Sequence, residues 1–119
     1  MGWLRRVRPA RSSNKVALDQ ATLAQLAKAG GDLTKSTDVR NFLLLRSDDD
    51  ARKATTQLES MGYSVHMQPV QNRKFKALLV ANSDMVPSAE NVAALRARFE
   101  TLASEYDGTY DGWEAAVTR

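Results

Sequence analysis

Apolar residues along this chain follow two spacings, one typical of helices and one typical of strands. The helical spacing predicts helices over residues 19–29, 48–61 and 88–106. The remaining apolar runs predict strands over residues 39–45, 63–68, 74–82 and 109–113. From residue 39 onward the predicted order is therefore β-α-β-β-α-β, preceded by one additional helix.

Local signals support the predicted ends of the helices. Asp19, Ser88 and either Ser47 or Asp48 are residues of the types that cap helix N-termini. Gly62 follows the second predicted helix, where glycine commonly ends a helix because it tolerates a positive φ. The ends of the helices are therefore predicted in two independent ways, by the apolar spacing and by these capping residues.

The apolar pattern also predicts the order of the strands in the sheet. Residues 39–45 and 74–82 are apolar on both faces, which favours central strands. Residues 63–68 alternate between apolar and polar, which favours an edge strand, and residues 109–113 supply the other edge beside 39–45. We therefore predict one ferredoxin-like α+β sandwich over residues 16–119, with a four-stranded antiparallel sheet and an extra N-terminal helix.

This topology leaves one face of the sheet without the two crossover helices. If Val39, Leu43 and Leu45 face those helices, then alternation turns Phe42 and Leu44 to the open side, together with Leu78 and Val80. An open apolar patch is unusual in a monomer. We expect helix 19–29, a second copy of the chain or a partner to cover it.

The composition excludes several kinds of active site and metal site. The 119 residues include no Cys and one His, His66, which excludes Cys nucleophiles, thiol redox chemistry and the usual zinc sites. Apolar residues make up 43% of the chain, but none of their runs approaches the length of roughly 20 residues that spans a bilayer. We expect a cytoplasmic protein with no membrane contact.

Positive charge is concentrated at the N-terminus. Residues 1–15 contain no acid and five cations, Arg5, Arg6, Arg8, Arg11 and Lys15. The other residues carry 12 basic and 14 acidic side chains. Two interpretations stay open for this basic arm: a flexible, solvated segment, or a weak electrostatic handle for nucleic acid or an acidic partner.

No catalytic constellation emerges from the sequence. An RNA-recognition domain needs stacking aromatics on both central strands, and the first of them offers only Phe42. A phosphate-binding loop after that strand needs glycine and positive charge, whereas Asp48-Asp49-Asp50 stands there. This triplet fits helix capping better than a cation site, and His66 fits a surface position better than a catalytic one. We predict a non-catalytic binding domain without cofactor or metal.

The stretch Tyr110-Asp111-Gly112-Trp113 places two aromatics close to the end of the chain. Alternation puts Tyr110 on one face of the last strand and Asp111 and Trp113 on the other, although Gly112 could allow a bulge. Either the aromatics anchor this edge, one on each face, or Trp113 joins Phe42 in a docking surface. The candidate partner-binding residues are Phe42, Leu44, Tyr110, Asp111 and Trp113.

Several stretches, in order, resemble the ribonuclease E inhibitor family called regulator of ribonuclease activity B. They are GGDLTKSTDVRNFLLL, DDDARKATTQLESMGYSV and MVPSAENVAALRARFETLASEYDGTYDGW, and the resemblance covers roughly residues 30–117. The residues that match the family signature are Met85, Pro87, Tyr110, Asp111, Gly112 and Trp113.

The resemblance implies a ferredoxin-like fold and a regulator that is not an enzyme. It also implies a protein partner, which is ribonuclease E or its non-catalytic scaffold region. By binding this partner, the regulator is expected to reduce the cleavage of transcripts by the enzyme. The alternative hypothesis is a nucleic-acid-associated protein that acts through the basic arm.

Overall fold

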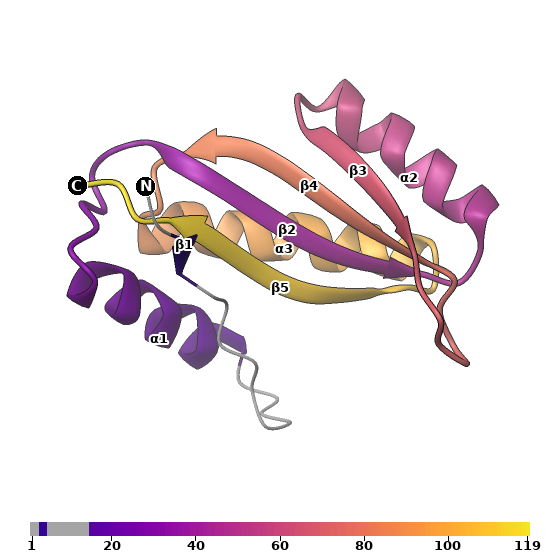
Figure 1. Ribbon diagram of the computed structural model, residues 1–119, viewed down its shortest axis with the longest axis horizontal. Coiled ribbons are helices and arrows are strands. Elements are labelled where there is room, and N and C mark those ends of the chain that lie inside the picture. Colours follow the sequence, from indigo (N-terminus) through magenta and orange to yellow (C-terminus); the bar gives the residue numbers. More distant parts are fainter. Residues whose placement is uncertain (1–2, 5–14) are drawn as a thin grey trace.

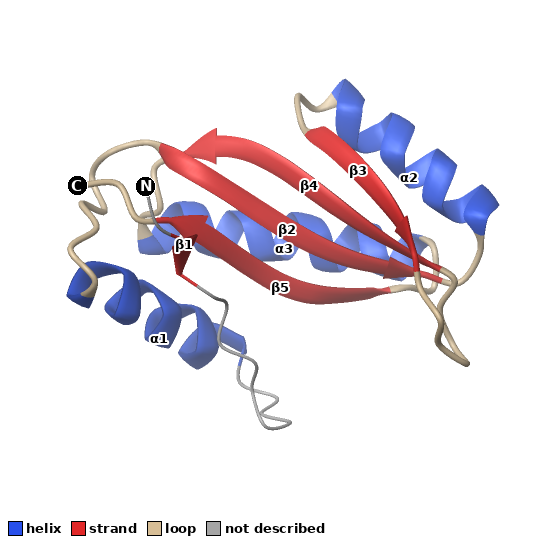
Figure 2. Ribbon diagram, in the orientation of Figure 1, coloured by secondary structure: helices blue, strands red, loops and turns tan. Residues whose placement is uncertain are grey.

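The computed structural model describes residues 3–4 and 15–119 (Figure 1). The elements in chain order are β1 (Trp3–Leu4), α1 (Lys15–Lys28), β2 (Thr37–Leu45), α2 (Asp48–Ser60), β3 (Ser64–Pro69), β4 (Ala77–Met85), α3 (Ala89–Glu105) and β5 (Thr109–Ala116). Figure 2 shows the same elements by type. From β2 onward the order is the predicted β-α-β-β-α-β.

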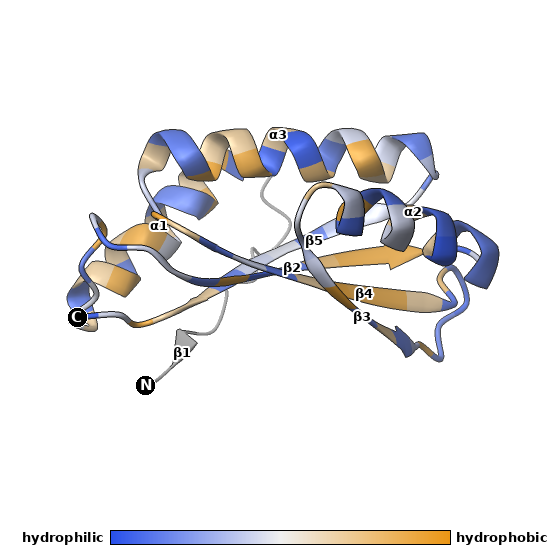
Figure 3. Cartoon of the chain, turned by 90° about the horizontal axis from the view of Figure 1, so that it is seen from above, coloured by the Kyte–Doolittle hydropathy of each residue, from blue (hydrophilic) through white to orange (hydrophobic). Residues whose placement is uncertain are grey.

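The strands form one antiparallel sheet in the order β1-β5-β2-β4-β3. The two strands with apolar residues on both faces, β2 and β4, are central, and β3 is an edge, as predicted. The three helices lie on one side of the sheet (Figure 3). This arrangement confirms the predicted ferredoxin-like α+β sandwich. The short β1, which pairs with Ala115 and Ala116 of β5, was not predicted.

The hydrophobic core lies between the helices and the sheet. The sheet contributes Val39, Leu43, Leu45, Ala77, Leu79 and Ala81, and the helices contribute Leu23, Leu26, Ala51, Ala54, Leu58, Val92, Leu95, Phe99 and Leu102. The buried residues of α2 and α3 recur every three or four positions, as the helical spacing requires, whereas Met61, immediately after α2, is 44% exposed.

The two long crossover helices begin where the capping signals predicted. Ser47 Oγ accepts a hydrogen bond from the Asp50 backbone N–H at 3.1 Å, and Ser88 Oγ accepts one from Asn91 at 3.1 Å. Gly62 has a φ of +96°, as expected of a residue that ends a helix. The local chemistry at these ends is therefore sufficient to fix the helix boundaries.

Several details of the elements differ from the prediction. α1 begins at Lys15, so Lys15 belongs to a helix and Asp19 lies within the helix instead of capping it. β4 runs from Ala77 to Met85, so it begins later than predicted and includes part of the expected loop. β3 does not alternate cleanly between a buried and an exposed face, because only Val65 within it is half-buried.

Candidate functional site

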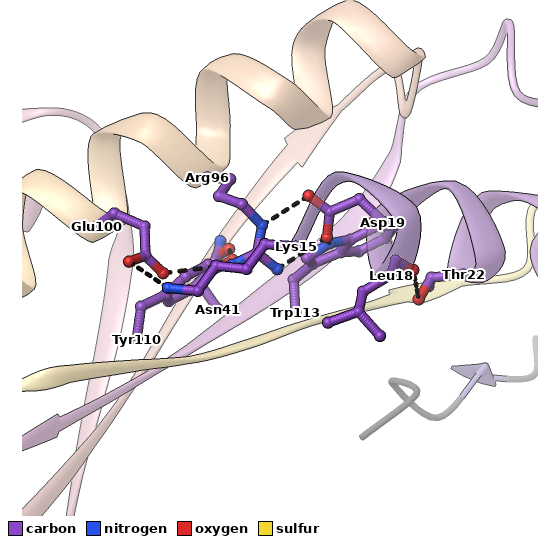
Figure 4. A network of polar contacts seen from close by, with 9 residues as sticks. All are labelled: Lys15, Leu18, Asp19, Thr22, Asn41, Arg96, Glu100, Tyr110 and Trp113. Carbon is purple, nitrogen blue, oxygen red and sulfur yellow. Dashed lines mark hydrogen bonds and ion pairs between the residues drawn. The ribbon is translucent and has the colours of Figure 1, made fainter. Parts of the chain in front are cut away.

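A buried polar network joins α1, α3 and β5 (Figure 4). Its centre is a two-pronged ion pair, in which Arg96 Nε lies 2.7 Å from Asp19 Oδ2 and Nη2 lies 2.8 Å from Asp19 Oδ1. The Trp113 indole N–H donates to the same Oδ1 at 2.9 Å. The Asp19 side chain is only 10% exposed and that of Arg96 15%. One carboxylate therefore ties together three elements that are far apart in the sequence.

Glu100 extends the network toward the surface. It lies one helical turn after Arg96 and accepts a hydrogen bond from Arg96 Nη1 at 3.3 Å. Its other oxygen lies 2.7 Å from Lys15 Nζ, which fastens the first turn of α1 to α3. Of the five cations assigned to the basic arm, Lys15 is thus engaged within the domain, whereas Arg5, Arg6, Arg8 and Arg11 lie outside the described residues.

Tyr110 continues the network into the core. Its hydroxyl donates to Asn41 Oδ1 at 2.7 Å, and its ring stacks on Phe99 with the centroids 5.2 Å apart. The Arg96 guanidinium carbon lies 5.2 Å from the centre of the Tyr110 ring. Burial raises the pKa of Tyr110 well above its ordinary value, so the phenol stays protonated. The group is suited to a structural hydrogen bond and unsuited to proton transfer near neutral pH.

A β-bulge explains why Tyr110 and Trp113 both face the helices. Gly112 has a φ of +100°, and the pairing of β5 with β2 shifts so that Asp111 has no opposite residue. Trp113 lies opposite Asn41, and the exposed fractions of Trp113 and Tyr110 are 2% and 7%. The expectation that the two rings lie on opposite faces, with Trp113 beside Phe42, is wrong, because the extra residue resets the alternation.

We expect Gly112→Ala to lower the free energy of unfolding by about 1–3 kcal/mol, because a side chain is strained at this positive φ. Chemical denaturation monitored by Trp fluorescence measures this change. Glu114→Ala, two residues further along β5, is the matched control, since its ion pair with Arg40 is 4.0 Å long and weak. Equal stabilities of the two variants would contradict the bulge argument.

The open face of the sheet carries the predicted apolar residues. The register places Phe42 opposite Val80 and Leu44 opposite Leu78. Phe42 is only 8% exposed, while the other three are half-buried, so this face is less bare than predicted. The expectation that helix 19–29 covers it is wrong, because α1 lies on the other side, against α3 and Trp113 (Figure 3).

The remaining residues of the family signature, Met85, Pro87 and Asp111, lie where they support the fold. Met85 ends β4 and packs against the core, and the side chain of Pro87 is fully buried immediately before the cap of α3. Asp111 is the half-buried extra residue of the bulge. The signature at the end of the chain therefore lies in β5, which is not the outermost strand as predicted, because β1 pairs with the end of β5. A role in binding for Phe42, Leu44 and Asp111 stays a prediction.

His66 and the triplet Asp48-Asp49-Asp50 were predicted to be surface groups and not site residues. Within residues 3–4 and 15–119, no three His, Cys, Asp or Glu side chains gather as a metal site would require. His66 is exposed on the open face, and Asp49 pairs with Lys53 at 3.2 Å on the surface of α2. None of the helices in the described part of the chain is long and apolar enough to cross a bilayer.

Two of the hollows on the helical side share lining residues. One, of about 320 Å³, is between α2 and α3, and the other, of about 580 Å³, is near the start of β3; both include Met61 and Arg98. Arg98 Nη1 donates to the Tyr63 hydroxyl at 2.8 Å. The linings include a hydroxyl and a carboxylate each, Thr101 with Glu105 and Ser83 with Asp84, and in the described structure no hydrogen bond joins the two groups of either pair.

The Asp19–Arg96 pair was missed at the sequence level, although a signal was available. Asp19, Thr22, Leu23 and Leu26 share one face of α1 and are all buried. A carboxylate at a position of an apolar stripe indicates a buried partner, because unpaired charge is costly in the interior. Arg96 comes four positions after the buried Val92 and three before the buried Phe99, so it lies on the buried face of α3 and gives the complementary signal.

Comparison with known proteins agrees with the family resemblance found in the sequence. A family model described as Regulator of ribonuclease activity B matches residues 17–115. The match begins within α1 and ends within β5, so it includes every member of the buried network except Lys15. The comparison with curated proteins found no match.

Proposed function

The chain belongs to the regulator of ribonuclease activity B family, and we propose that it binds an RNA-degrading enzyme, ribonuclease E or its scaffold region, and lowers its activity without catalysing a reaction. The family match over residues 17–115 is the observation that carries this proposal. Such a regulator acts in the cytoplasm, where transcripts are degraded.

The chemistry of the described residues supports a binding role. The most heavily interacting polar side chains, Asp19, Arg96 and Tyr110, have partners inside the protein, and they position helices without offering a reactive group. The surface instead offers features that another protein can contact: a half-buried apolar sheet face and an edge strand. A regulator that works by contact needs these features and no active site.

Affinity capture from the native cell tests the proposal. A tagged full-length chain is expected to recover the ribonuclease from a lysate treated with nuclease, so that RNA cannot bridge the two proteins. A chain that begins at residue 15 is the comparison, because it lacks Arg5, Arg6, Arg8 and Arg11 but keeps α1. Capture that persists without the arm supports contact through the folded domain. Recovery of no RNA-decay component by either chain would contradict the proposal.

A further inference from the structure

The two edges of the sheet differ in how they are protected. At one edge, β5 carries a bulge and pairs with β1, and both features hinder the addition of another strand. At the other edge, the six residues of β3 pair with β4 in a regular register. Ser64 to Gln68 contain no Lys, Arg, Asp or Glu, and charged side chains are a common protection of edges. β3 is therefore the less protected edge.

The register shows which backbone groups of β3 are available. The Val70 N–H bonds to the Lys76 carbonyl at 3.1 Å, and hydrogen-bonded pairs alternate along an antiparallel ladder. Ser64, His66 and Gln68 consequently bond to β4, while the N–H and C=O groups of Val65 and Met67 point outward. Pro69 is also at an outward position, where the ladder needs no N–H donor. Because Pro69 has no N–H, the outward N–H and C=O groups that a further strand can pair with are those of Val65 and Met67.

Side chains around this edge suit a peptide with both apolar and acidic residues. The Met67 side chain is 43% exposed, which gives an apolar contact beside the free backbone groups. Arg73, Lys74 and Lys76 are exposed in the loop that joins β3 to β4, which extends beyond the end of the sheet (Figure 1). In the described part of the chain, none of these three cations has a carboxylate within ion-pair distance.

We infer that β3 binds an extended, acidic segment of the ribonuclease as an added strand. This inference rests on the proposed function and names the surface that performs it. The outward groups of Val65 and Met67 hydrogen-bond to the backbone of the segment, as in other cases of strand addition. Arg73, Lys74 and Lys76 attract its acidic residues, which increases the rate of association and favours acidic over basic sequences.

A proline substitution separates backbone pairing from side-chain contact. Met67→Pro removes an outward N–H and leaves the bonds between β3 and β4 in place, whereas Met67→Ala removes the side chain and keeps the N–H. The probe is an immobilised series of overlapping 12-residue peptides that covers the sequence of ribonuclease E from the same cell. We expect wild type and Met67→Ala to bind the same acidic peptides, and Met67→Pro to bind them about tenfold more weakly.

Two checks keep this test decisive if Met67→Pro folds poorly. Circular dichroism and thermal unfolding show whether the variant is native, and Gln68→Pro, which removes a donor to β4, is expected to be less stable than Met67→Pro. In the wild-type chain, hydrogen exchange provides a measurement without any substitution. Peptide binding is expected to slow exchange of the Val65 and Met67 amides, and unchanged exchange at both would overturn the inference.

Charge reversal tests the choice of an acidic segment. The triple variant Arg73→Glu, Lys74→Glu and Lys76→Glu is expected to lose at least about tenfold in affinity for the acidic peptides, with a smaller loss at high salt. Lys28→Glu, at the end of α1, is the matched control because it is an exposed cation on another element. Equal binding by the triple variant and the control would overturn the inference.

The outcomes distinguish this inference from the proposed function. If the chain captures the intact ribonuclease but binds none of its peptides, or binds them equally after Met67→Pro, strand addition fails while the proposed function stands. If it captures neither ribonuclease nor peptide, both fail. If Met67→Pro instead abolishes a concentration-dependent dimer of the chain and the peptides do not bind, the occupant of β3 is a second copy, and the inference is overturned.

Discussion

Asp19→Ala is expected to lower the free energy of unfolding by about 3 kcal/mol, the low end of the range for breaking a buried ion pair. The substitution leaves the Arg96 guanidinium without its two shortest hydrogen bonds, at 2.7 and 2.8 Å, and removes the acceptor of the Trp113 indole. Burial keeps water from replacing these contacts fully, because the Arg96 side chain is only 15% exposed. The loss also removes one of the two ion pairs that join α1 to α3, leaving the exposed Lys15–Glu100 pair.

Urea denaturation monitored by circular dichroism measures this effect. Asp49→Ala is the matched control, since Asp49 also pairs with a cation, Lys53, but its side chain is 65% exposed. Exposed pairs and first-turn carboxylates each contribute about 1 kcal/mol or less. If Asp19→Ala and Asp49→Ala had the same midpoint and slope, the network would not hold α1 in place.

Phe99→Ala is expected to cost about 3–5 kcal/mol, the usual cost of truncating a buried phenylalanine. Phe99 is completely buried at the centre of α3. Its ring contacts Tyr63 edge-to-face, with centroids 5.4 Å apart, and stacks on Tyr110 at 5.2 Å. Removal of the ring therefore leaves a cavity and takes away two aromatic contacts at once.

Thermal unfolding of the wild type, Phe99→Ala and Phe99→Leu tests this prediction. Phe99→Leu is the control, because leucine keeps most of the apolar volume and loses chiefly the ring contacts, so its midpoint should lie between those of wild type and Phe99→Ala. A Phe99→Ala midpoint within one or two degrees of the wild type would contradict the assignment of Phe99 to the centre of the core.

The sheet could be predicted because its determinants are local and repeated. The apolar residues on both faces of 39–45 and 74–82 require central strands, and those strands are β2 and β4. The caps at Ser47 and Ser88 depend on hydrogen bonds across three residues, so the sequence around them contains the whole motif. Both features need no information from distant parts of the chain.

The buried ion pair and the β-bulge could not be predicted in the same way. Asp19 and Arg96 are 77 positions apart, and locally Asp19 has the properties of a helix cap. The faces of Tyr110 and Trp113 depend on where the extra residue at Asp111 enters the ladder, and a sequence that permits a bulge does not require one. These features are set by tertiary pairing, which decides among several locally acceptable conformations.

The most direct test of the central claim is the rate at which purified ribonuclease E cleaves a defined RNA, measured at increasing concentrations of the purified full-length chain. A regulator that acts by binding is expected to reduce the rate to a plateau, reached at a fixed molar ratio of the two proteins. The heat-unfolded chain at the same concentrations is expected to have no effect. An unchanged cleavage rate in the presence of a large molar excess of the folded chain would contradict the proposed function.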